Sequence, residues 1–282
     1  MAFIQTINGK IWYKTFGENQ RVPLIVVHGG PGCPHDYLEP LEDLGNNREV
    51  IFYDQIGCGL SDRLDDPNLM TPATFVDELA EIIRNLKLNK FHLLGQSWGA
   101  GLAAAFALEK PKGLKSIILT DSYLSTPVWE KDAKRLIKTL PKPMQTALRK
   151  NDLQSKEFKE ASDEYYKRYV SRLRERPKAF DKMMKGFSDT VYETMWGPKE
   201  FLATGTLRSF DLVPRLHEIN YPTLLIAGRF DEATPESAKL FQSLIPNAEL
   251  AIFEESAHCP FWSEREKFNK AVEVFLEKTE QA

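Results

Sequence analysis

The chain has 282 residues, which is enough for one large α/β domain or two small ones. Its apolar fraction of 42% and aromatic fraction of 11% are ordinary for a globular protein, and its formal net charge of −3 gives no general positive field. No segment reaches the roughly 18 apolar residues that span a bilayer. We therefore expect neither nucleic acid nor membrane among its partners, and the composition sets no oligomeric state.

The cysteine content indicates the compartment. Cys33, Cys58 and Cys259 cannot all pair within one chain, and none has the Cys or His spacing of a zinc site. Free thiols are the rule in a reducing compartment. The first residues also lack the basic region and the long apolar stretch of a signal peptide. We expect a cytoplasmic protein.

The first 124 residues alternate between strand and helix patterns. Residues 10–16 read as an edge strand, whereas 24–27 and 50–53 are unbroken apolar runs, typical of strands covered on both faces. Further strands are predicted at 91–94 and 116–119, with helices at about 72–86 and 98–109. Strand and helix in repetition predict a mostly parallel sheet with right-handed crossovers.

The pattern changes between residues 125 and 210. This stretch is charged and rich in helix formers, and residues 157–174 carry a helical stripe of apolar side chains. Afterwards the first pattern returns, with strands predicted at 223–227 and 249–253 and helices at about 235–244 and 264–277. The sequence predicts an α/β core, formed by 1–124 and 211–282, that a helical insertion at 125–210 interrupts.

The strongest chemical motif is Gly95-Gln96-Ser97-Trp98-Gly99. It directly follows a predicted strand and directly precedes a predicted helix, which is the setting of the nucleophile elbow in the α/β-hydrolase fold. The glycines are needed because a Cβ at either position would collide with neighbouring backbone. The turn leaves Ser97 at a helix N-terminus, where N–H groups favour negative charge. Ser97 is the predicted nucleophile.

A second motif, His28-Gly29-Gly30-Pro31-Gly32, follows the predicted strand at 24–27. A glycine-rich loop at this place lets backbone N–H groups point inward and supplies one arm of an oxyanion hole. The residue after the nucleophile supplies the other arm. We therefore predict that the N–H groups of Gly30 and Trp98 hold the oxyanion, and that His28 organises the loop by hydrogen bonding.

A serine nucleophile needs a base, and the base needs an acid to orient it. In this fold the three follow the order Ser, acid, His, so the base lies late in the chain. His217 precedes the strand at 223–227 and comes too early. His258 follows the strand at 249–253 by a short loop and is the predicted base.

Two residues are candidates for the acid. Asp231 ends the strand that precedes the one leading to His258, and Asp121 ends the earlier strand at 116–119. The loop around Asp231 favours it, with Gly228 at the turn and Pro235 starting the next helix. In that case Asp121 is an ordinary residue at the end of a strand.

These motifs together resemble those of one family. Residues 28–32, the segment Asp54-Gln55-Ile56-Gly57-Cys58-Gly59-Leu60-Ser61, the elbow and the segment 196–201 are similar to those of the proline iminopeptidases, which include the tricorn-associated aminopeptidases. The resemblance covers nearly the whole chain. It departs at Ala100, where many members have glycine, and this hints at a subfamily with amide or arylamide substrates.

The resemblance implies an α/β-hydrolase fold, with a mostly parallel eight-stranded sheet and a helical cap at 125–210. It also implies release of an N-terminal residue, preferentially proline, from a short peptide or aminoacyl amide through an acyl-enzyme, without metal or other cofactor. The family's two substrate-binding glutamates correspond to Glu200 and Glu232. A carboxylate pair in a partly dry pocket would hold a cationic amino end at a fixed distance from Ser97.

Two other functions remain open at this point. An amino-acid amidase or an esterase would use the same three side chains, and hydrolysis of prolyl amides, other aminoacyl amides and simple esters would separate these activities. A receptor that keeps the fold without turnover would belong to a different class. The intact set of Ser97, Asp231 and His258 argues against a receptor, and labelling by a fluorophosphonate probe would test it.

Overall fold

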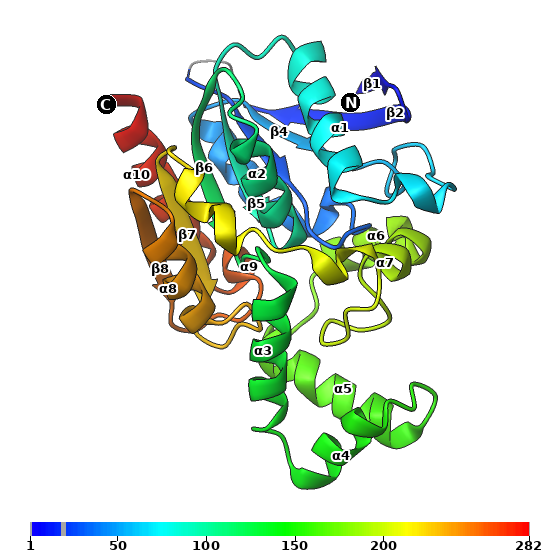
Figure 1. Ribbon diagram of the computed structural model, residues 1–282. Coiled ribbons are helices and arrows are strands. Elements are labelled where there is room, and N and C mark those ends of the chain that lie inside the picture. Colours follow the sequence, from blue (N-terminus) through cyan, green and yellow to red (C-terminus); the bar gives the residue numbers. More distant parts are fainter. Residues whose placement is uncertain (1, 18–20, 282) are drawn as a thin grey trace.

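A computed structural model describes residues 2–17 and 21–281, so positions 1, 18–20 and 282 of the predicted core lie outside it. In the described residues eight strands form one sheet in the order β1-β2-β4-β3-β5-β6-β7-β8 (Figure 1). The strands are β1 (Ala2–Thr6), β2 (Gly9–Phe16), β3 (Leu24–Val27), β4 (Val50–Tyr53), β5 (Phe91–Gln96), β6 (Leu114–Thr120), β7 (Thr223–Gly228) and β8 (Ala248–Phe253). β2 is antiparallel to both neighbours and all other pairs are parallel. The expected eight-stranded, mostly parallel sheet is confirmed.

The central strands are apolar throughout because helices cover both faces of the sheet. Successive residues of a strand point to opposite faces, and in β3 Ile25 and Val27 join one hydrophobic cluster while Leu24 and Val26 join another. The first cluster includes side chains of α1 (Pro72–Asn85), α2 (Trp98–Leu108) and α8 (Pro235–Leu244). The second includes side chains of η1 (His35–Asn46), α9 (Pro260–Ser263) and α10 (Arg265–Gln281). The sheet therefore lies between two helical layers.

Between β6 and β7 the chain forms the helical segment predicted at 125–210. Its helices are α3 (Thr126–Ile137), α4 (Lys142–Lys150), α5 (Lys156–Tyr169), α6 (Lys178–Gly186), α7 (Asp189–Met195) and η3 (Thr206–Ser209); η4 (Val213–Glu218) follows it, and η2 (Pro67–Leu69) precedes α1. α3, α4 and α5 project away from the sheet in Figure 1. α4 and α5 share a small apolar cluster of their own, whereas side chains of α3 and α7 belong to the main core.

Two details of the sequence prediction were wrong. β2 is not the edge strand, because β1 pairs along its outer side from Ala2↔Tyr13 to Thr6↔Gly9. The helix expected at 157–174 ends at Tyr169, and the carbonyl of Val170 accepts a hydrogen bond from the His258 N–H at 3.2 Å. The chain thus leaves the helix to contact a loop of the core. In the ranges that the structure describes, no helix combines the length and apolar character needed to cross a bilayer.

One helix of the core carries a buried carboxyl group. Glu78 in α1 is 2% exposed; its Oε2 accepts a hydrogen bond from the Ile56 N–H at 2.8 Å, and no described residue bonds its Oε1. Burial raises the pKa of Glu78 to about 8. The folded protein thus favours the protonated acid.

The stability of the protein should therefore depend on the proton of Glu78. Because the folded pKa is raised, its contribution is complete below the unfolded pKa of about 4.5 and is lost as pH rises to about 8. Glu78→Gln removes this loss, so its unfolding free energy should fall less steeply than that of the wild type, by up to about 1.4 kcal/mol per pH unit. Urea unfolding between pH 5 and pH 8 measures the two slopes, and parallel slopes would contradict the assignment.

Candidate active site

Ser97 lies in the tight turn between β5 and α2. Its backbone has φ 55° and ψ −120°, a conformation that L residues rarely adopt. A Cβ on Gly95 would lie 2.2 Å from the carbonyl oxygen of Gly99, and one on Gly99 would lie 2.1 Å from that of Val27. Glycine is therefore required at both places, and the turn presents the half-buried Ser97 at the start of α2.

The predicted oxyanion groups lie beside Ser97. Gly30 and Trp98 line the same small cavity as the serine, and Gly30 has φ +109° in the loop after β3. Among the described residues, no hydrogen bond engages the backbone N–H of either residue. Two free donors next to a serine can accept the negative charge that develops on an attacked carbonyl.

A buried hydrogen-bond network holds the loop that carries Gly30. Gln55 Nε2 donates to the carbonyl of His28 at 2.8 Å, the Gln55 N–H donates to His28 Nε2 at 2.9 Å, and Trp98 Nε1 donates to Gln55 Oε1 at 3.0 Å. Burial lowers the pKa of His28 to about 4, so its ring is a neutral acceptor. His28 thus organises the loop as expected, and Gln55 of the segment 54–61 links that loop to the elbow.

Two residues of this network were missed by the sequence analysis. Tyr37 Oη accepts a hydrogen bond from the Gly29 N–H at 2.7 Å and donates to Gln96 Oε1 at 2.6 Å. Gln96 Nε2 in turn donates to the carbonyl of His258 at 3.2 Å. The side chain next to the nucleophile therefore connects the oxyanion loop to the loop of the base. In the sequence, only the position of Gln96 within the elbow motif could have indicated that it connects these two loops.

His258 and Asp231 meet at the ends of neighbouring strands. His258 Nδ1 lies 2.6 Å from Asp231 Oδ1, which also accepts the Ala233 N–H at 2.9 Å. The ring of Trp129 packs edge-on against the imidazole, with centroids 6.0 Å apart. Burial lowers the pKa of His258, which keeps the imidazole neutral and able to take up a proton.

The prediction that Asp121 is an ordinary strand-end residue was wrong. Asp121 is fully buried, and a carboxylate oxygen of Asp121, one of Asp231 and a ring nitrogen of His258 lie within 4.8 Å of one another. Parallel strands β6 and β7 end side by side, which brings the two aspartates together. His258 Nδ1 is engaged by Asp231 rather than Asp121.

Glu200 and Glu232 come from different parts of the chain and lie close enough for their charges to interact. Glu200 lines the cavity with Ser97, and its Oε1 accepts a hydrogen bond from Tyr192 Oη at 2.8 Å. Glu232 follows Asp231 and is 2% exposed, and neither of its carboxylate oxygens has a hydrogen-bond partner among the described residues. Burial raises the pKa of both groups, and the charge of Glu200 raises that of Glu232 further. Two buried carboxyl groups with so few donors favour a cationic ligand.

The cavity itself is small and largely aromatic. Its volume is ≈ 10 Å³, far below the usual range for ligand sites, and its lining consists of Gly30, Ser97, Trp98, Tyr123, Trp129, Trp196, Glu200 and Leu207.

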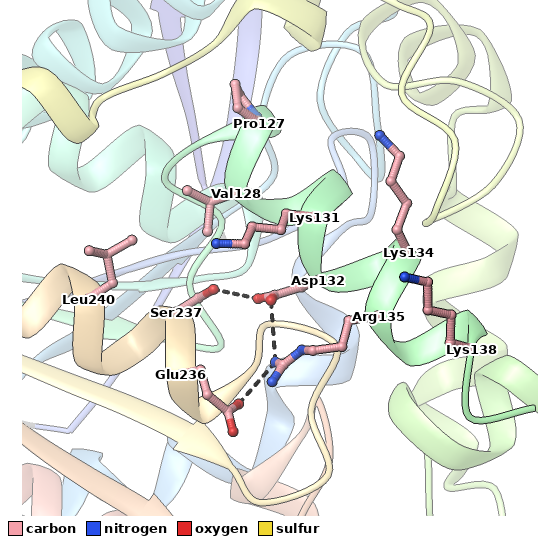
Figure 2. Close-up of a pocket in the computed structure, with 10 residues that line it drawn as sticks. All are labelled: Pro127, Val128, Lys131, Asp132, Lys134, Arg135, Lys138, Glu236, Ser237 and Leu240. Atoms are coloured by element: carbon pink, nitrogen blue, oxygen red, sulfur yellow. Dashed lines mark hydrogen bonds and ion pairs between the residues drawn. The ribbon is translucent and has the colours of Figure 1, made fainter.

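A larger hollow lies between α3 and α8 (Figure 2). Its lysine and arginine side chains are solvent-facing, and Arg135 is paired with Asp132 and Glu236. Asp132 Oδ2 also accepts hydrogen bonds from Thr234 Oγ1 at 2.7 Å and from Ser237 Oγ. These bonds fasten α3 to the segment that follows Glu232, so this hollow marks a structural contact.

The three cysteines are free thiols. Burial raises the pKa of Cys58 and of Cys259, so both stay protonated near neutral pH and are poor nucleophiles. Although Cys58 and Cys259 lie near the motifs in the sequence, we therefore assign neither thiol a role in catalysis.

Comparison with known proteins agrees with this geometry. The family model described as alpha/beta hydrolase fold matches residues 22–265. The chain is 41% identical to a proline iminopeptidase of Heyndrickxia coagulans, with 98% of each chain covered, and 37% identical to one of Clostridium botulinum, with 99% and 98% covered. The crystal structure of a proline iminopeptidase of Mycobacterium smegmatis superimposes with a TM-score of 0.93 at 34% identity, covering 99% and 98% of the chains.

The chain belongs to the proline iminopeptidase family. It is a hydrolase of the α/β fold. An esterase of Thermogutta terrifontis superimposes with a TM-score of 0.72 at 22% identity over 99% and 98% of the chains, a likeness that shows the fold alone.

The network around the oxyanion loop can be tested at Tyr37. Tyr37→Phe leaves the buried Gly29 N–H without an acceptor and frees Gln96, so the loop carrying Gly30 should be less well placed. We expect kcat for hydrolysis of a prolyl arylamide to fall roughly tenfold with little change in KM. Tyr53→Phe is the matched control, because Tyr53 Oη is buried and no described residue bonds it. Equal effects of the two changes would show that the network does not support catalysis.

Proposed function

We propose that the protein is a serine aminopeptidase that releases an N-terminal residue, preferentially proline, from short peptides or aminoacyl amides. The observation that carries this proposal is the pair Glu200 and Glu232. Glu200 lines the cavity of Ser97, and the buried carboxyl group of Glu232, which has no hydrogen-bond donor among the described residues, lies close enough to Glu200 to feel its charge. A charged amino end fits such a pair, and the names of the relatives point to the same substrates.

The proposed mechanism assigns each side chain one role. His258 removes the proton of Ser97 as its Oγ attacks the substrate carbonyl, and Asp231 holds the imidazole in the required tautomer. The N–H groups of Gly30 and Trp98 stabilise the oxyanion. His258 then protonates the leaving amine, and water hydrolyses the acyl-enzyme by the same steps in reverse order. These steps use only side chains and backbone of this chain.

The helical segment at 125–210 is the proposed cap. Ser125 and Asp211 form a bridge, and the Thr126 N–H donates to the Phe210 carbonyl at 2.8 Å, so the segment leaves and rejoins the core at one place. Its residues Trp129, Trp196 and Glu200 line the cavity. The cap therefore both limits the size of the site and supplies half of the carboxylate pair.

The proposed cellular setting follows from the same features. Three free thiols suit a reducing compartment, so we place the protein in the cytoplasm. Short peptides are the proposed substrates there, and no nucleic acid or membrane takes part in the reaction.

Substitution of the two glutamates tests the substrate assignment. Glu200→Gln and Glu232→Gln should raise KM for a prolyl arylamide, because each removes one carboxylate from the site of the amino end. Loss of one partner of a desolvated charge pair costs about 2–5 kcal/mol, so kcat/KM should fall roughly thirtyfold or more. Part of the loss should fall on kcat, since the clamp also positions the carbonyl at Ser97.

Three controls separate a loss of amino-end binding from a general loss of activity. Glu236→Gln changes an exposed carboxylate nearby, which pairs with Arg135, and should leave the kinetics unchanged. Hydrolysis of a small neutral ester should survive in both glutamate variants and disappear in Ser97→Ala. If the glutamate variants lose ester and arylamide hydrolysis equally, the pair does not bind an amino end.

A further inference from the structure

Two acidic side chains, Asp121 and Asp231, meet behind the imidazole of His258, although the proposed mechanism needs only one. Asp121 follows β6 with φ 51°, and its N–H donates to the carbonyl of Ile226 in β7 at 2.8 Å. Asp121 and Asp231 are 0% and 1% exposed. The backbone of two adjacent strands thus fixes both carboxyl groups in one dry space.

Each carboxyl group has one oxygen in use and one without a partner. Asp121 Oδ2 accepts a hydrogen bond from Thr120 Oγ1 at 2.8 Å, and Asp231 Oδ1 accepts from Ala233 and His258. Among the residues that the structure describes, Asp121 Oδ1 and Asp231 Oδ2 have no hydrogen-bond donor. An oxygen of one carboxyl group lies within 4.8 Å of an oxygen of the other, and two ionised carboxylates this close would repel each other strongly where water is absent. One proton between the two free oxygens removes the repulsion and satisfies both atoms.

We propose that a single proton joins Asp121 Oδ1 to Asp231 Oδ2, and that Asp121 is a positioning residue that donates a hydrogen bond to the acid of the triad. The proposal rests on the proposed roles of Ser97, Asp231 and His258. It extends the hydrogen-bonded chain to four side chains, from Thr120 through Asp121 and Asp231 to His258.

The charge of the pair resides on Asp231. Its carboxylate accepts the Ala233 N–H and the His258 Nδ1–H, whereas that of Asp121 accepts only a hydroxyl. Burial raises the pKa of Asp231 to about 7, whereas burial and the neighbouring charge of Asp231 raise the pKa of Asp121 well above its usual value, so Asp231 is the first of the two to ionise. The other titratable groups near Asp121 are His258, Tyr37 and Cys259, and burial keeps each of them neutral.

The neutral acid has two consequences for catalysis. Its hydrogen bond prevents rotation of the Asp231 carboxylate, so Oδ1 remains aimed at His258 Nδ1. It also leaves a single negative charge to stabilise the imidazolium that forms during attack. Asp121 acts through Asp231 and does not touch the substrate.

Substitution at Asp121 shows whether its side chain acts as a hydrogen-bond donor or as a negative charge. In Asp121→Asn the amide can still donate to Asp231 Oδ2, so kcat for a prolyl arylamide should stay within about threefold of wild type. Asp121→Leu keeps the same branched shape without a donor, and kcat should fall roughly tenfold or more with KM little changed. Asp231→Asn should lower kcat by orders of magnitude. If Asp121→Asn is as damaging as Asp121→Leu, or if Asp121→Leu retains full kcat, the proposal is overturned.

Infrared spectroscopy of the enzyme without substrate detects the proton directly. At pH 7 the difference spectrum of wild type minus Asp121→Asn should contain the C=O stretch of a protonated carboxyl group. Absence of that band would overturn the proposal even if the enzyme is fully active. The infrared band reports the proton whether or not the enzyme is active. If Ser97→Ala kept its activity, the proposed triad itself would be wrong, which is a different outcome. Loss of activity in EDTA with recovery on adding Zn²⁺ would show that a cation, rather than a proton, joins the two carboxylates.

Discussion

The close approach of α2 to the backbone of β3 is the constraint on which the site depends. Only glycine fits at Gly95 and Gly99, and the turn between them forces Ser97 into a left-handed conformation at a helix N-terminus. Because β3, β5, β6 and β7 are parallel, their carboxyl ends meet at one edge. The loop after β3 therefore lies beside the serine, and the loop after β7 supplies the acid.

Charge, rather than size alone, characterises the cavity. Glu200 lines it, the charge of Glu200 acts on Glu232, and Asp231 contacts the imidazole of His258. The imidazole is neutral before the reaction, and among the described residues neither glutamate forms a salt bridge, although the charge of Lys199 lowers the pKa of Glu200. A substrate that brings its own ammonium group fills this gap, which explains why the aminopeptidase proposal fits better than an esterase. The helical segment at 125–210 contributes Glu200, so the proposed binding of an amino end depends on how this segment sits on the core.

Much of the fold could be predicted because its signals are local. Apolar runs predicted β3 and β4, and the helices predicted from Pro72 and from Pro235 begin at those residues as α1 and α8. β1 was missed because it is a five-residue strand in which Phe3 is 57% exposed, so its pattern is weak. The C-terminus of α5 was misplaced because a distant partner, His258, sets it.

In the candidate site, too, some residues have local sequence signals and others depend on contacts between distant parts of the chain. The elbow, the glycine loop and the order of acid and base pointed to Ser97, Gly30, Asp231 and His258, and the resemblance added the two glutamates. Tyr37 and the pairing of Asp121 with Asp231 could not be predicted, because they depend on which strands are neighbours in the sheet. Sequence order alone separates these groups by many residues.

In the proposed reaction the enzyme recognises a free amino end before it attacks the adjacent carbonyl. The most direct test compares kcat/KM of the wild-type enzyme for a prolyl arylamide with that for its N-acetylated form. Acetylation should lower kcat/KM roughly thirtyfold or more, because the carboxylate pair loses its cation. Equal rates for the two substrates would contradict it and would make the protein a general amidase or esterase.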